Sequence, residues 1–123
     1  MTRRPEDLHP ALAVAFNAGD LDSVLALYDP EAVFVIKPGQ VTDGPAQLRA
    51  ALRRLIELGG HLTIHPHSFV RSGNVVLVLG SFTLSGHRRD GTAFKRESRF
   101  ADVLRQQPDS RWLLAVDNAF NEY

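Results

Sequence analysis

The chain has 123 residues, which suits one domain that buries about two thirds of its unfolded surface. Its 14 Lys and Arg residues balance 14 Asp and Glu residues, which argues against a nucleic-acid partner. The lack of Cys excludes disulfides, thiol nucleophiles and thiolate metal sites. No apolar run approaches the roughly 18 residues of a membrane span, and the N-terminus turns acidic where a signal peptide would turn apolar. We expect one cytoplasmic domain over residues 1–123, flexible at 1–4, with no membrane partner.

Three helices and one strand are predicted in the first half. Gly19 can take the left-handed conformation that ends a first helix, and the Asp20 side chain can cap a second one. A third helix starts at Asp43-Gly44-Pro45 and ends before Gly59-Gly60. The first two helices are expected at residues 5–18 and 20–28, and the strand at 32–37.

The second half alternates strands with turns. The turns are Ser72-Gly73, Asp90-Gly91 and the loop 107–110. Helices followed by hairpin-linked strands are typical of an α+β fold, in which one antiparallel sheet curls around helices packed on one face. The strands are expected at residues 61–71, 74–87, 92–106 and 111–121.

Two aspartates on neighbouring strands are the candidate chemical groups. If Asp90-Gly91 is a two-residue turn, Asp102 lies opposite Leu79, and if Gln106 pairs with Arg111, Asp102 lies opposite Ala115. Asp102 and Asp117 are then diagonal neighbours on one face, about 7 to 8 Å apart. In an apolar pocket such a pair raises at least one pKa. A bulge would move one of them to the other face, and the structural alternative is a solvated or salt-bridged aspartate.

Several segments carry a family resemblance. Asn17-Ala18-Gly19-Asp20, the segment 28–34 and the strands around 99–105 and 111–114 resemble the ketosteroid isomerase and polyketide cyclase group, with its SnoaL-like domains, in the nuclear transport factor two-like superfamily. The resemblance covers nearly the whole chain. It implies a cone-shaped curved sheet around three N-terminal helices, with a pocket between them. That scaffold carries enzymes, binding domains and assembly hubs, so the activity stays open.

The resemblance also assigns roles to individual positions. The oxyanion-hole tyrosine of ketosteroid isomerase aligns with Leu12 and its general base with Ile36 or Lys37, so both are missing and steroid isomerisation by that mechanism is not expected. Its protonated aspartic acid aligns with Asp102, and the acid/base aspartate of the polyketide cyclases aligns with Asp117. Asp117 would then be the general base and protonated Asp102 the oxyanion donor in a cofactor-free isomerisation, cyclisation or hydrolysis.

The expected ligand is a small apolar or aromatic molecule. Arg96 has the same strand parity as Asp102 and could lie at the pocket rim, whereas Arg99 has the opposite parity. The residues predicted to contact the ligand are Leu12, Phe16, Phe34, Ile36, Leu48, Leu52, Ser98, Phe100 and Ala115.

The alternative is a noncatalytic ligand-binding or assembly domain. The chain also resembles the association domain of the calmodulin-dependent kinases around Ser98 and Arg111-Trp112, although that relative has an arginine in its pocket where this chain has Asp102. An apolar outer sheet face predicts a homodimer. The residues assigned to that interface are Val103, Trp112, Leu114 and Val116.

The five histidines raise the question of a metal site. His61, His65 and His67 alternate on one strand, but the parity places them on the outer face and no carboxylate pattern accompanies them. We therefore expect neither a metal nor a cofactor. His9 and His87 are expected to be exposed.

Overall fold

Helices fill the N-terminal part of the chain and strands the rest. The computed structural model describes residues 2–119. After a short 3₁₀ turn (Pro5–Asp7), the elements are α1 (Leu8–Asn17), α2 (Leu21–Leu25), β1 (Tyr28–Lys37), β2 (Gln40–Val41), α3 (Gly44–Glu57), β3 (His61–Ser72), β4 (Val75–His87), β5 (Ala93–Gln106) and β6 (Trp112–Asp117). The predicted continuation of the last strand to residues 120–121 lies outside the described residues.

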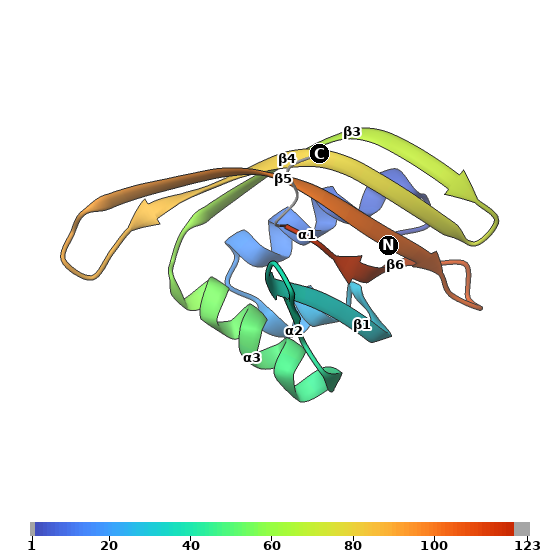
Figure 1. Cartoon of the computed structure of the whole chain (residues 1–123), viewed down its shortest axis with the longest axis horizontal. Coiled ribbons are helices and arrows are strands. Elements are labelled where there is room, and N and C mark those ends of the chain that lie inside the picture. Colours follow the sequence, from blue (N-terminus) through green and yellow to red (C-terminus); the bar gives the residue numbers. More distant parts are fainter. Residues whose placement is uncertain (1, 120–123) are drawn as a thin grey trace.

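The strands form one curved, unclosed sheet that arches over the helices (Figure 1). Its strand order is β2-β1-β6-β5-β4-β3. The strands β3 to β6 form the predicted antiparallel meander, whereas β1 joins the sheet parallel to β6. The predicted α+β class, with helices first and a curved sheet packed around them, is confirmed. Within residues 2–119, no helix combines the length and apolar character needed to cross a membrane.

The junction between α1 and α2 follows the sequence prediction. Gly19 has a φ of 69°, in the left-handed region, and the Asp20 side chain accepts a hydrogen bond from the Ser23 backbone N–H at 3.1 Å. The second helix ends earlier than predicted, because the chain enters β1 at Tyr28. That earlier start brings Tyr28 beside β6, where it pairs with Leu114.

The hairpin between β4 and β5 has a different register from the predicted one. Its loop has three residues, since the Arg88 N–H donates to the Thr92 carbonyl at 2.8 Å and Gly91 takes a φ of 86°. One extra loop residue shifts the pairing by one position and exchanges the two faces of β4. Val78, and not Leu79, therefore lies opposite Asp102. The inward-facing residues of β4 are Val76, Val78, Gly80, Phe82 and Leu84.

The pairing of β5 with β6 also differs from the prediction. Gln106 pairs with Trp112, and the register shifts between Val103 and Leu104, which is the bulge that the prediction allowed for. Trp112 and Leu114 consequently lie in the hydrophobic core, at 1% and 0% exposure, so their assignment to an outer interface is wrong. Val103 and Val116 pair with each other and lie on the outer face.

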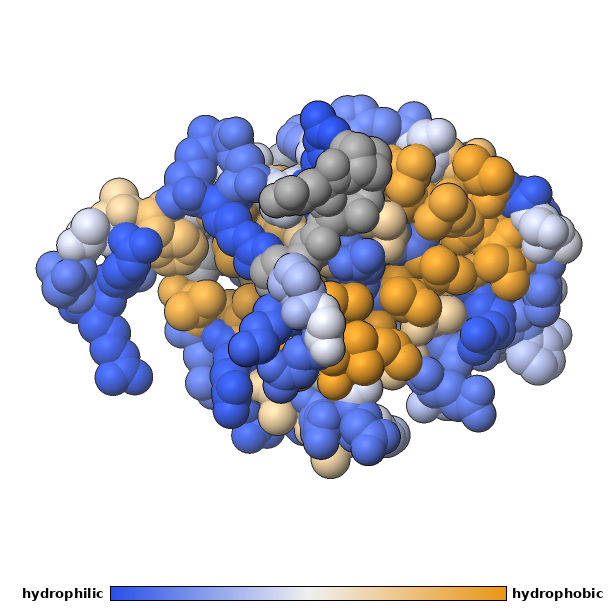
Figure 2. Space-filling view, viewed as in Figure 1, coloured by the Kyte–Doolittle hydropathy of each residue, from blue (hydrophilic) through white to orange (hydrophobic). Residues whose placement is uncertain are grey.

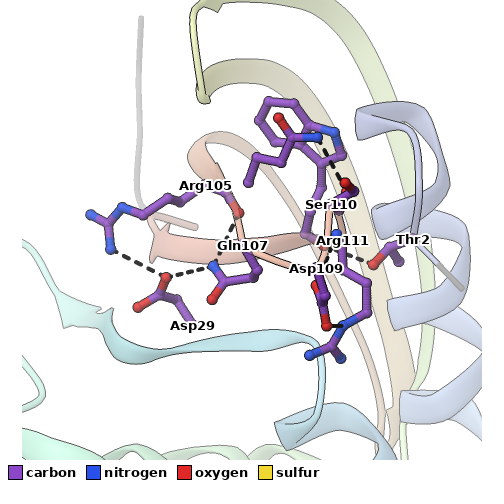
Figure 3. A network of polar contacts seen from close by, with 9 residues as sticks. Thr2, Asp29, Arg105, Gln107, Asp109, Ser110 and Arg111 are labelled. Carbon is purple, nitrogen blue, oxygen red and sulfur yellow. Dashed lines mark hydrogen bonds and ion pairs between the residues drawn. The ribbon is translucent and has the colours of Figure 1, made fainter.

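A polar network joins Thr2 and the start of β1 to the β5–β6 hairpin (Figure 3). Thr2, in the segment expected to be flexible, is buried and exchanges two hydrogen bonds with the Trp112 backbone, at 2.7 and 2.8 Å. Asp29, near the start of β1, accepts a hydrogen bond from Gln107 at 2.8 Å and pairs with Arg105 at 3.2 Å. These contacts fix the start of β1 against the β5–β6 hairpin.

Candidate functional site

A cavity of about 540 Å³ lies between the helices and the inner face of the sheet. Most of its wall is apolar, which suits a small organic molecule. Its polar and charged side chains come from five elements, α1, α3, β1, β5 and β6, and from β2 at the edge. The apolar side chains in the wall include Leu12, Phe16, Val24, Phe34, Ile36, Leu52, Leu55, Leu62, Ile64, Phe82, Leu84 and Phe100.

Most of the predicted ligand contacts lie in that wall. Leu48 instead packs into the core, and Ala115 is buried beside the β5–β6 bulge. The Ser98 hydroxyl donates to the carbonyl of Ala119 at 3.1 Å and does not line the cavity. The predicted contacts that do line it are Leu12, Phe16, Phe34, Ile36, Leu52 and Phe100.

Asp102 and Asp117 lie close together at the wall of this cavity. Val103 pairs with Val116, so the next residue along each antiparallel strand, Asp102 and Asp117, occupies neighbouring positions on the inner face. They share a face, as the sequence predicts, through a different register from the predicted one. Both strand pairings differ from the prediction, and β5 has a bulge, but Asp102 and Asp117 still lie on the same face of the sheet.

Within residues 2–119, Asp102 has two hydrogen-bond partners. Its Oδ2 lies 2.7 Å from His9 Nε2, and its Oδ1 accepts a hydrogen bond from the Asn118 N–H at 2.9 Å. His9 is only 2% exposed and stacks on Phe100, with 4.9 Å between ring centroids. The expectation that His9 is exposed is therefore wrong. Its other nitrogen, Nδ1, is buried without a hydrogen-bond partner among the described residues.

Asp117 has a different environment from Asp102. Its Oδ2 accepts a hydrogen bond from the Tyr28 hydroxyl at 2.5 Å. Burial, followed by the charge of Asp102, raises the pKa of Asp117 to about 8, against the opposing effect of the Tyr28 hydrogen bond. Burial and the neighbouring Asp117 carboxylate raise the pKa of Tyr28 well above its ordinary value. At pH 7 the cavity wall thus holds one protonated carboxyl group and one phenol.

His9 and Tyr28 are the site residues that the sequence analysis missed. His9 stands three residues before Leu12 and seven before Phe16, so it belongs to the same helical stripe as two predicted cavity residues. That spacing could have placed His9 inside. Tyr28 was assigned to the end of a helix, and only the early start of β1 brings its hydroxyl to Asp117.

The remaining histidines do not form a metal site. His61 and His65 pair with Ser85 and Ser81 on the outer face, and His67 lies at a bulge where its Nε2 is 3.1 Å from the Ser81 hydroxyl. Among residues 2–119, no group of three His, Cys, Asp or Glu side chains is arranged to hold a metal ion. His87 is exposed, as predicted.

Comparison with known proteins identifies the family of this pocket-bearing fold. The family model of the SnoaL-like domain matches residues 11–114. The chain belongs to the SnoaL-like domain family. No curated protein gives a significant match to the sequence.

Solved structures share the fold of this SnoaL-like domain. A ketosteroid isomerase-like protein from Erwinia carotovora atroseptica has a TM-score of 0.79 at 21% identity, over 91% of this chain and 88% of that one. An NTF-2-like protein of unknown function from Shewanella oneidensis has 0.77 at 20%, over 94% and 95%. An NTF2-like superfamily protein from Salmonella enterica has 0.78 at 16%, over 94% and 88%. The predicted membership of the nuclear transport factor two-like superfamily is confirmed.

Proposed function

We propose that the cavity binds a small apolar or aromatic molecule and that Asp117 exchanges a proton with it, without a cofactor. The observation that carries this proposal is the position of Asp117, a carboxyl group with a pKa of about 8 in the wall of a largely apolar cavity of about 540 Å³. A pKa close to the working pH is the value at which a general acid or base is most effective.

The surroundings of the two aspartates support a revised division of roles. Asp102 faces the His9 ring nitrogen and a backbone N–H, both of which can stabilise its charged form, whereas Asp117 accepts only the Tyr28 hydroxyl among the described residues. In this proposal the charge of Asp102 helps to keep the proton on Asp117. Protonated Asp117 acts as the acid, and after losing its proton it acts as the base. The sequence-based proposal had a protonated Asp102 as the oxyanion donor.

Tyr28 and His9 act as positioning residues in this scheme. The Tyr28 hydroxyl holds Oδ2 of Asp117, which leaves Oδ1 to exchange a proton with the bound molecule. His9 holds Asp102 through the contact of its Nε2 with Oδ2. The reaction class is therefore proton transfer on a small organic molecule, as in an isomerisation, a cyclisation or a hydrolysis.

A generic proton-abstraction reaction tests this chemistry without knowledge of the natural substrate. In 5-nitrobenzisoxazole, a carboxylate removes the C3 proton, the freed electron pair forms a nitrile, and the N–O bond breaks to give a coloured nitrophenolate. We expect the protein to accelerate this reaction, with a rate that rises as pH increases through about 8. Asp117→Asn should lower the rate by about 100-fold or more.

The matched control is the exposed Asp43, which lies outside the cavity. Asp43→Asn should leave the rate unchanged. A wild-type rate no higher than that of free acetate at the same concentration, or an Asp117→Asn variant as active as the wild type, would remove Asp117 from any mechanism.

The second candidate function is a noncatalytic binding or assembly domain, in which the outer face of the sheet contributes to a large ring. Figure 2 shows apolar side chains gathered over the right-hand half of the molecule, and hydrophilic side chains on the β4–β5 arm at the left. Phe69 and Val70 are exposed, at 38% and 56%, and Val103 and Val116 lie on the outer face. Mass measurement in solution separates the candidates: a plain dimer suits the pocket function, and a large ring suits assembly.

A further inference from the structure

The cavity has a buried polar end and an exposed mouth. At the polar end, His9, Asp102 and Tyr28 line the wall and are 2%, 3% and 6% exposed. The Tyr28 hydroxyl donates to Asp117, and His9 contacts Asp102. The exposed residues of the wall lie on or beside β2 and α3, and they mark the mouth: Gln40, Gln47, Ala50, Arg54 and Leu58. A bound molecule that enters at the mouth extends toward the polar end.

One ring nitrogen at the polar end lacks a partner in the protein. Nδ1 of His9 is buried and has no hydrogen-bond partner among the described residues. The rest of the ring is held in place, since Nε2 lies 2.7 Å from Asp102 Oδ2 and the ring stacks on Phe100. His9 lies in α1 and lines the cavity. Buried polar groups are nearly always hydrogen-bonded, so an unpartnered one in a cavity wall indicates a partner on the ligand.

The contact with Asp102 decides which kind of hydrogen bond Nδ1 can form. Oδ1 of Asp102 accepts from the Asn118 N–H, and the charge of Asp102 acts on its neighbour Asp117. A carboxylate oxygen can only accept, so the proton between Oδ2 and His9 belongs to Nε2. In a neutral imidazole, one nitrogen carries the proton and the other offers a lone pair. Nδ1 of His9 is then an acceptor.

We propose that His9 Nδ1 accepts a hydrogen bond from the ligand, which is an apolar or aromatic molecule with a hydroxyl or N–H group at its inner end. This inference rests on the proposed binding function of the cavity and names the chemical class of its ligand. Asp102 and Phe100 fix the ring, so the lone pair of Nδ1 has its direction before the ligand binds. A molecule without the donor leaves Nδ1 unpartnered, and the site discriminates against it.

Two fluorescent probes of similar size test this inference, 2-naphthol, which has a hydroxyl donor, and 2-fluoronaphthalene, which has none. At pH 7 we expect the wild-type protein to bind 2-naphthol about fivefold more tightly, the factor that corresponds to one hydrogen bond of about 1 kcal/mol. His9→Gln keeps an N–H group that can reach Asp102 but has carbon in place of Nδ1. This variant should reduce the preference to about twofold or less.

The matched control is His87→Gln, because His87 is exposed and does not line the cavity. It should keep the fivefold preference. Equal affinities of the wild type for the two probes, or a preference that persists in His9→Gln, would overturn the acceptor role of Nδ1 and leave the apolar cavity standing. Binding of neither probe would overturn this inference and the proposed binding function together.

Nitrogen NMR of the wild-type protein gives a second readout, which holds even if His9→Gln folds poorly. Long-range ¹H–¹⁵N spectra of the histidine rings show which nitrogen carries the proton. We expect the proton on Nε2 of His9, and we expect 2-naphthol, but not 2-fluoronaphthalene, to shift the Nδ1 resonance in the direction of a hydrogen-bonded acceptor. A proton on Nδ1 in the free protein, or an Nδ1 resonance that bound 2-naphthol leaves unchanged, would overturn the inference.

Discussion

Two carboxylate networks of this domain differ in what surrounds a buried aspartate. In the network of Figure 3, burial alone would raise the pKa of Asp29, but donors from the Glu31 backbone, Gln107 and Arg105 hold it below its ordinary value. In the cavity, the described residues supply Asp117 with one hydroxyl donor and a second carboxyl beside it, and its pKa is raised to about 8. Burial raises the pKa of both carboxyl groups, and the number of donors decides whether that pKa ends above or below its ordinary value.

The comparison separates a structural carboxylate from a reactive one. Asp29 is outside the cavity, and its three donors keep it charged at pH 7, so it fastens strands and exchanges no proton. Asp117 lines the cavity and stays near its titration point. A buried aspartate is therefore a candidate acid or base when its donors are few and a ligand can reach it.

The largest expected effect comes from removing the side-chain partner of Asp102 and, for comparison, that of Asp29. Asp102 and Asp29 side chains are equally buried, at 5% exposure, but His9 is 2% exposed and Arg105 is 43% exposed. His9→Ala should cost about 1 to 3 kcal/mol, because it leaves a buried carboxyl oxygen without its hydrogen-bond partner. Arg105→Ala should cost about 1 kcal/mol or less, because water can replace the guanidinium. Urea unfolding at pH 7 measures both; similar losses would contradict the distinction.

A smaller effect concerns the pH dependence of stability. The folded-state pKa of Asp117 is above its unfolded value, so the folded protein binds more protons than the unfolded chain between about pH 4 and 8. Stability should therefore fall as pH rises through that window. Asp117→Asn, which mimics the protonated acid, should flatten this slope and make the variant more stable than the wild type above pH 8. If the free energy of unfolding changed equally between pH 5 and pH 9 in the two proteins, the raised pKa of Asp117 would be disproved.

The smallest expected effect is on the titration of Asp117 itself. The Tyr28 hydrogen bond lowers the pKa of Asp117, so Tyr28→Phe should raise that pKa further, by about one pH unit. The midpoint of the Asp117 carboxyl resonance measures the change. The control is the Asp29 carboxyl group in the same Tyr28→Phe variant, and its titration midpoint should not change. A downward shift of the Asp117 midpoint would show that Tyr28 does not donate to Asp117.

Much of the fold could be predicted because it depends on local signals. The Gly19 and Asp20 pair fixed a helix end and a helix cap, and the alternation of turns fixed the strand count of the second half. Loop length could not be predicted in the same way. Asp90-Gly91 suits a two-residue turn or the last part of a three-residue loop, and only the pairing of Arg88 with Thr92 decides between them.

The site was predictable in part for a related reason. Parity along a single strand is reliable, so Phe100, Asp102 and Arg96 were placed on one face without knowledge of the partner strand. Contacts between distant elements were not predictable. His9 reaches Asp102 across 93 positions and Tyr28 reaches Asp117 across 89, and no local pattern encodes either distance.

The most direct test of a tuned acid in the cavity is a carbon-detected NMR titration of the Asp117 and Asp29 carboxyl groups in the same sample. Asp117 should titrate near pH 8, and Asp29 below the roughly 3.9 of a free aspartate. An Asp117 midpoint at or below that of a free aspartate would contradict the account. The carboxyl pair would then be a structural network, and the domain would bind its ligand without proton transfer.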